Sequence, residues 1–159
     1  MPLGWLISVL VLLPNLLWML FPPHGSPAPE SAPRGGLARL MEGLEWAGRL
    51  GCLVIPFFYR LEVKTGLQIG ALVTAALALS LYYAGWARYF VRGRSYRLLF
   101  EPLLAVPLPL ATGPVVYFPA AAVLLGSWPL GLAAVALGVG HLYVTHHSFQ
   151  AWRRREPAL

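Results

Sequence analysis

Three charged residues share one helical face within an otherwise apolar stretch. Glu42, Glu45 and Arg49 follow one another at spacings of three and four, which stacks their side chains along one side of a helix. In the pair Glu45 and Arg49 the acid is nearer the N-terminus, the favourable order for an ion pair. The pattern indicates either a polar patch inside a helix bundle, which binds a proton or ligand, or the wet face of an interfacial helix over 37–48.

His141 is the histidine best placed for a binding role. It lies near the middle of the apolar segment 130–152, about 16–18 Å from each end by helical rise. The chain contains no His-x-x-x-His pair and no zinc-type spacing, so no metal site is predicted. A haem axial ligand needs no spacing motif. Two readings therefore remain for His141, a haem or proton ligand and a histidine hydrogen-bonded inside the bundle.

Prolines crowd the apolar segment 102–125. Each internal proline lacks a backbone donor and clashes with the carbonyl four residues earlier, which predicts an interrupted or kinked helix. Freed carbonyls inside a membrane need partners, and transporters use interrupted helices to bind ions. We expect either a purely structural kink or a polar gap at residues 109–114. The side chains expected at that gap are His141, Thr112, Asn15 and Tyr143.

The connection 88–101 is rich in arginine. These side chains are expected to lie on the cytoplasmic surface and to bind anionic lipid headgroups. The acid Glu101 is expected to pair with Arg97 at the start of the next helix, where an acid also suits the helix dipole. The lipid-contacting residues predicted here are Arg88, Arg92, Arg94 and Arg97.

Sequence motifs for enzymatic chemistry are missing. The sequence has no nucleophile elbow, no phosphate-binding loop and no dinucleotide fingerprint, and it contains no Asp. Cys52 is the only cysteine, which excludes an intramolecular disulfide and a cysteine metal cage. We therefore assign no catalytic residue, metal or cofactor from the sequence.

The amino-acid composition indicates the class of protein in which these residues lie. Of the 159 residues, 58% are hydrophobic and 11% are charged. A soluble domain is typically about 25% charged, so too few polar side chains exist here to cover a water-soluble globule. The net charge of +6 is explained by arginines flanking membrane spans, and nucleic-acid binding is not expected. The prediction is an all-α, polytopic transmembrane helical bundle.

Long uncharged runs, turn residues and, for the second span, a helical pattern that carries four charges divide the chain into five spans within one membrane domain. A Pro-, Gly- and Ser-rich segment over 22–36 is expected to be a mobile linker. The last uncharged stretch is too long for one crossing of a hydrocarbon core about 30 Å thick, so it turns back at 126–129. The predicted spans are 3–21, 37–60, 66–87, 102–125 and 130–152, with the second either crossing fully or starting as an interfacial helix.

The basic residues set the orientation of the spans. With the N-terminus outside, ten of the twelve Lys and Arg residues fall on the cytoplasmic side, and Arg60 and Lys64 lie outside. Positive residues concentrate on the cytoplasmic side of membrane proteins. We therefore predict an outside N-terminus and a cytoplasmic C-terminus, in the plasma (bacterial inner) membrane.

Three segments carry a family resemblance. Residues 11–23 (VLLPNLLWMLFPP), 86–104 (WARYFVRGRSYRLLFEPLL) and 106–118 (VPLPLATGPVVYF) resemble small, uncharacterised bacterial multi-pass membrane proteins of about this length. The resemblance covers most of the chain. It implies about five spans and no particular catalytic residue.

Three functions fit this sequence. The favoured one is a non-enzymatic accessory or interaction subunit, in contact with the lipid bilayer, other membrane proteins or a second copy of itself. The alternatives are a small oligomeric transporter or channel, and a membrane enzyme or haem protein that uses His141. The sequence names neither a substrate nor a partner.

Overall fold

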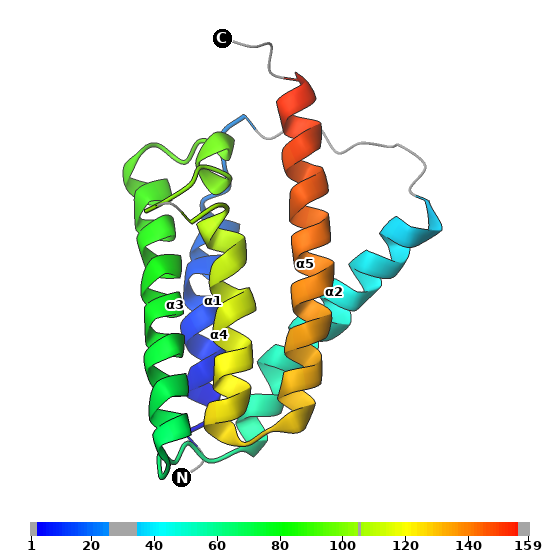
Figure 1. Cartoon of the computed structure of the whole chain (residues 1–159). Coiled ribbons are helices and arrows are strands. Elements are labelled where there is room, and N and C mark those ends of the chain that lie inside the picture. Colours follow the sequence, from blue (N-terminus) through cyan, green and yellow to red (C-terminus); the bar gives the residue numbers. More distant parts are fainter. Residues whose placement is uncertain (1–2, 26–34, 105, 156–159) are drawn as a thin grey trace.

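The computed structural model describes residues 3–25, 35–104 and 106–155. The described chain is all-α, with five α-helices joined by short connections (Figure 1). Two 3-10 helices, η1 (Ile55–Phe58) and η2 (Tyr96–Leu99), lie in the connections. The α-helices are α1 (Trp5–Leu20), α2 (Gly36–Val54), α3 (Gly66–Val91), α4 (Pro109–Leu125) and α5 (Trp128–Arg155).

Successive helices run in opposite directions, so the connections gather at two ends of the bundle (Figure 1). Helices α1, α3 and α4 form one group, α5 packs on α4, and α2 packs mainly on α5 and leans away from the rest. The contact between α3 and α4 is built from small and aromatic side chains. The buried residues there include Ala71, Ala75, Ala78, Tyr82, Tyr117, Phe118 and Ala121.

Two helices, α3 and α5, are long and apolar enough to cross a membrane, and α1 and α4 are shorter apolar helices. This composition points to a membrane location. The helices match the predicted spans in number and order, with different ends. The second predicted span, 37–60, consists of α2 followed by η1, and the central part of the predicted linker, 26–34, lies outside the described residues.

The turn between α4 and α5 is the one predicted at 126–129. Gly126 has a positive φ of 61°, and the amide of Ser127 donates to the carbonyl of Ala122 at 2.9 Å, which closes α4 with a Schellman motif. The Ser127 hydroxyl then accepts from the amide of Leu130 at 3.3 Å and caps the start of α5. The two helices are thus joined as a tight hairpin.

The fourth helix begins later than predicted, at Pro109 instead of near residue 102. A proline is well suited to the first turn of a helix, where its missing N–H would have no partner. Leu104 and Leu108, with φ of 49° and 51°, break the helical path before it. The prolines at 102 and 107 therefore lie in the connection, and only Pro114 and Pro119 are inside the helix.

Two prolines in other helices free carbonyls that hydroxyl groups then satisfy. Pro14 in α1 leaves the carbonyl of Leu10 without its helical partner, and the Tyr83 hydroxyl donates to it at 2.7 Å. Pro56 in η1 does the same to the carbonyl of Cys52, which accepts from the Ser8 hydroxyl at 3.3 Å. These bonds fasten α1 to α3 and to the end of α2, and they satisfy backbone groups as an apolar solvent requires.

The small-residue stripe Gly66, Gly70, Thr74 and Ala78, which reads as a helix-packing face in the sequence, does not pack as a unit. Gly66 and Gly70 have no neighbour within 4 Å of an added Cβ, and Thr74 is exposed. The buried line of α3 passes instead through Ala71, Ala75 and Ala78. The contact face of α3 is thus rotated by about one residue from the line through Gly66, Gly70 and Thr74.

Candidate functional site

The candidate site lies where α2 crosses α5. A Cβ on Gly48 would lie 2.2 Å from the amide nitrogen of Leu137, and one on Gly140 would lie 2.4 Å from the amide nitrogen of Glu45. Only glycine, which has no Cβ, permits two backbones to approach this closely. The crossing holds the middle of α2 against the middle of α5.

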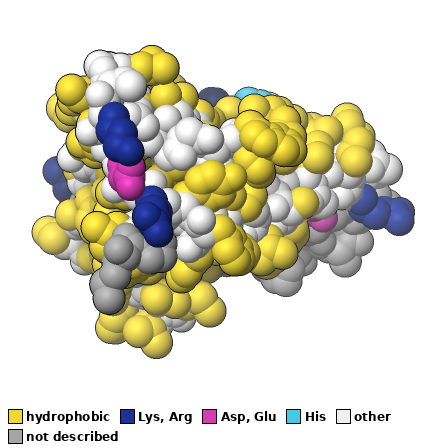
Figure 2. Space-filling view, turned by 90° about the horizontal axis from the view of Figure 1, so that it is seen from below, with side chains coloured by type: hydrophobic (Ala, Val, Ile, Leu, Met, Phe, Trp, Pro, Cys, Tyr) yellow, Lys and Arg dark blue, Asp and Glu magenta, His cyan; other side chains and the backbone are white. Residues whose placement is uncertain are grey.

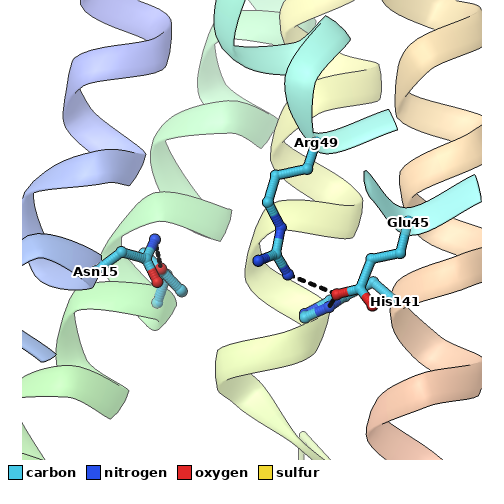
Figure 3. Close-up of polar contacts among 5 residues, drawn as sticks. Asn15, Glu45, Arg49 and His141 are labelled. Carbon is cyan, nitrogen blue, oxygen red and sulfur yellow. Dashed lines mark hydrogen bonds and ion pairs between the residues drawn. The ribbon is translucent and has the colours of Figure 1, made fainter. Parts of the chain in front are cut away.

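Glu45 is the centre of a polar cluster at this crossing (Figure 3). Its Oε1 atom lies 2.5 Å from Nη2 of Arg49 and 2.8 Å from Nδ1 of His141. The Glu45 side chain is 11% exposed and that of His141 is 21% exposed. The predicted pairing of Glu45 with Arg49 is confirmed, and His141, 96 residues away in the sequence, is its second partner.

The contact with Glu45 sets the chemistry of His141. An ionised carboxylate only accepts hydrogen bonds, so Nδ1 carries the proton and donates. In the neutral imidazole with this tautomer, Nε2 carries the lone pair. A carboxylate that fixes a histidine tautomer in this way prepares the other nitrogen to accept a proton or to ligate a metal. The cluster therefore has proton-binding or ligating capacity at one atom, Nε2 of His141.

The polar gap expected at 109–114 is not formed, because its members have other partners. The Thr112 hydroxyl, in the first turn of α4, donates at 3.0 Å to the carbonyl of Pro107 in the connection just before that helix. The Asn15 amide donates to the carbonyl of Val11 and to the Tyr82 hydroxyl, each at 2.9 Å. The Tyr143 ring contacts that of His147, with 4.3 Å between centroids. Since His141 bonds to α2, its partner comes from the helix that the sequence-based hypothesis did not consider.

The arginine-rich connection is organised by Arg88. Its guanidinium donates to the carbonyls of Glu101 at 2.6 Å, Pro102 at 2.8 Å and Leu98 at 3.3 Å. Arg88 therefore holds the connection between α3 and α4 in place. The predicted pair of Arg97 and Glu101 is present, with 2.8 Å between Nε and Oε1. Its predicted place at the start of a helix is wrong, because α4 begins only at Pro109.

Sequence reasoning missed a second contact at this end of the bundle. Nη2 of Arg94 lies 3.1 Å from Nε2 of His24, and the backbone of His24 exchanges hydrogen bonds with Arg94 and Tyr96. The guanidinium of Arg94 also lies 5.6 Å from the ring centroid of Phe21. The segment after α1 is thus tied to the α3–α4 connection. No sequence spacing signals this contact, because the residues are 70 positions apart.

Within the described ranges, no three His, Cys, Asp or Glu side chains lie close enough together to hold a metal ion. Comparisons with protein-family models, with curated proteins and with solved structures found no match to this chain.

Proposed function

We propose that this chain is an integral membrane protein that crosses the bilayer with five helices and acts as a non-enzymatic accessory or interaction subunit. The alternating helix directions and the distribution of basic residues support the five crossings. The end of the bundle that holds the α3–α4 connection and the end of α5 carries most of the arginines. The opposite end is largely hydrophobic, with few charged side chains (Figure 2), and among the described residues Arg60 and Lys64 supply its basic charge. This asymmetry favours an outside N-terminus and a cytoplasmic C-terminus.

The arginine-rich end is proposed to face the anionic lipid headgroups of the inner leaflet. Arg92, Arg94 and Arg97 lie in the α3–α4 connection, and Arg153 and Arg154 lie at the end of α5 on the same side. Each basic residue near an anionic surface contributes about 1 kcal/mol of attraction. Arg88 differs from the others, because its hydrogen bonds to backbone carbonyls already occupy it.

The observation that carries the interaction role is the outward face of α2. This helix leans away from α1, α3 and α4, and it contacts the bundle chiefly through α5 (Figure 1). Trp46 and Leu50 on its outer side are 69% and 64% exposed, and the charged Arg49 lies between them in the sequence. An apolar face interrupted by a charge suits a protein partner better than lipid tails.

Site-specific photo-crosslinking in native membranes tests this role. A photoreactive amino acid is placed at Leu50 on α2, and the matched control position is Leu77 on α3, which is 66% exposed. We expect a discrete protein adduct from position 50 and only lipid adducts from position 77. Lipid adducts alone from both positions would contradict an interaction role for α2.

A second candidate function is supported by the Glu45, Arg49 and His141 cluster. Ionisable residues inside a membrane often mark proton or ion pathways, which suits a small oligomeric transporter. The Nε2 atom of His141, for which the described residues show no hydrogen-bond partner, equally suits a haem-binding membrane enzyme. Proton flux into liposomes that depends on His141 would favour the transporter, and a haem absorption band lost in His141→Ala would favour the enzyme.

A further inference from the structure

Arg49 has more hydrogen-bond donors than the described part of this chain satisfies. A guanidinium carries five N–H donors. Within the described part of the chain, Arg49 makes one hydrogen bond, from Nη2 to Glu45, and its charge lies 5.5 Å from the ring centroid of Trp46. Its side chain is 45% exposed. The remaining donors face away from the Glu45 carboxylate and are accessible from outside the fold.

The depth of Arg49 decides what can satisfy those donors. It shares the Glu45 carboxylate with His141, which lies about 20 Å along α5 from either end of that helix. In the proposed orientation this places the guanidinium near the centre of a hydrocarbon core about 30 Å thick. Lipid phosphates lie at its boundary, beyond the reach of a side chain at this depth. Lipid tails offer no acceptor, so another acceptor is needed.

From this geometry we infer that Arg49 receives the acidic side chain of a partner's transmembrane helix, which packs along α2. The inference rests on the proposed interaction role and specifies the chemistry of the partner. A carboxylate matches the charge and planar donor arrangement of a guanidinium. In Figure 3 the guanidinium extends from α2 toward the side of the bundle where Asn15 of α1 lies.

A second copy of this chain fits this position poorly. Among the described residues, Glu45 is already engaged by Arg49 and His141, Glu42 also has a polar partner, and Glu101 pairs with Arg97 at one end of the bundle. Glu62 pairs with Lys64 at the other end. The acid that meets Arg49 is therefore assigned to a different protein.

Model transmembrane helices provide a direct test. The full chain is reconstituted in phosphatidylcholine vesicles with a Leu/Ala helix of about 20 residues, which carries either Asp or Leu at its centre. Association is followed by energy transfer between fluorophores on the chain and the helix. We expect the Asp helix to bind about tenfold more tightly than the Leu helix, a contrast typical of buried polar contacts between membrane helices.

Variants of the chain identify the group responsible. Arg49→Gln is expected to abolish the preference, Arg49→Lys to retain part of it, and Arg60→Gln, which removes an exposed charge at the bundle end, to leave it unchanged. If Arg49→Gln fails to fold because Glu45 keeps only His141 as a partner, the double variant Glu45→Gln/Arg49→Gln replaces it. Equal binding of both helices, or a preference that survives loss of Arg49, would overturn the inference.

A third arm of the experiment distinguishes a lipid anion from a protein carboxylate as the group that Arg49 binds. Loss of the Asp preference in vesicles that contain phosphatidylglycerol would assign Arg49 to a lipid anion and would also overturn the inference. The proposed interaction role fails independently, through the absence of a protein adduct at position 50. A protein adduct there without an Asp preference would leave the role intact and reject the acidic partner.

Discussion

A methyl group added at the crossing of α2 and α5 should weaken the fold far more than the same group added elsewhere on α2. Gly48→Ala places a Cβ 2.2 Å from the amide nitrogen and 2.6 Å from the Cα of Leu137. Both contacts are with backbone, so no side-chain rotation relieves them and the two helices must separate. Gly43, on the same helix, has no neighbour within 4 Å of such an atom, which makes Gly43→Ala the matched control.

The magnitude follows from two costs. Overpacking of this kind costs about 1–3 kcal/mol. Separation of the helices also lengthens the 2.8 Å contact between Glu45 and His141, and loss of a charge-assisted hydrogen bond costs about 1.5–3 kcal/mol. The gain in helix propensity from Gly to Ala, about 1 kcal/mol, offsets part of this. Gly48→Ala should therefore lower the free energy of unfolding by about 2–4 kcal/mol, whereas Gly43→Ala should leave it unchanged or raise it slightly.

Unfolding in mixed micelles with increasing dodecyl sulfate, followed by circular dichroism, measures this difference. A parallel pair on α5 consists of Gly140→Ala and the control Gly131→Ala, whose added Cβ makes only an ordinary contact of 3.9 Å with Ala122. Equal midpoints for the crossing variants and their controls would refute the close approach of α2 and α5, and with it the position of His141 beside Glu45.

Three further contacts give predictions of their own. Tyr83→Phe leaves the carbonyl of Leu10 unpaired and should lower the free energy of unfolding by about 1–3 kcal/mol. The loss should be smaller in a Pro14→Ala background, where residue 14 regains an N–H that can donate to this carbonyl. The hydrogen bond from Lys64 lowers the pKa of Glu62, so the NMR titration midpoint of Glu62 should lie below 4.5. The ion pair should be lost as the pH falls through that midpoint, and Lys64→Gln should raise the midpoint. Arg88→Gln removes three hydrogen bonds to carbonyls, and limited proteolysis should then cut the connection 92–108 faster.

Much of the helical layout could be predicted from local sequence. Uncharged runs located all of the helices except α2, which a helical pattern with four charged residues predicted, and Gly126 with Ser127 located the turn between the last two. These signals act within a few residues of the chain. The prolines of the fourth segment were harder to place. A proline tolerated at a first helical turn and a proline that interrupts a helix look alike in sequence, and only the structure shows that α4 starts at Pro109.

The candidate site could be predicted only in part. The pair Glu45 and Arg49 follows from a spacing of four on one helix. The partner of His141 depends on which helix crosses α5 and at which residue of α5 the crossing lies. The close approach at Gly48 and Gly140 fixes both. The sequence around Gly48 and Gly140 does not indicate which helix either glycine contacts. Adjacency along the chain favoured α4 as the partner of His141, whereas packing brings α2 there.

Cysteine labelling in intact cells tests whether the chain crosses the membrane five times with its N-terminus outside. Cys52 is fully buried, so single cysteines can be introduced at Lys64, between η1 and α3, and at Arg154, at the end of α5, with Cys52→Ala as the background. Both positions are exposed. A membrane-impermeant maleimide added to intact cells should label position 64, and it should label position 154 only after the membrane is opened. The reverse pattern, or labelling of both positions in intact cells, would contradict five crossings with an outside N-terminus.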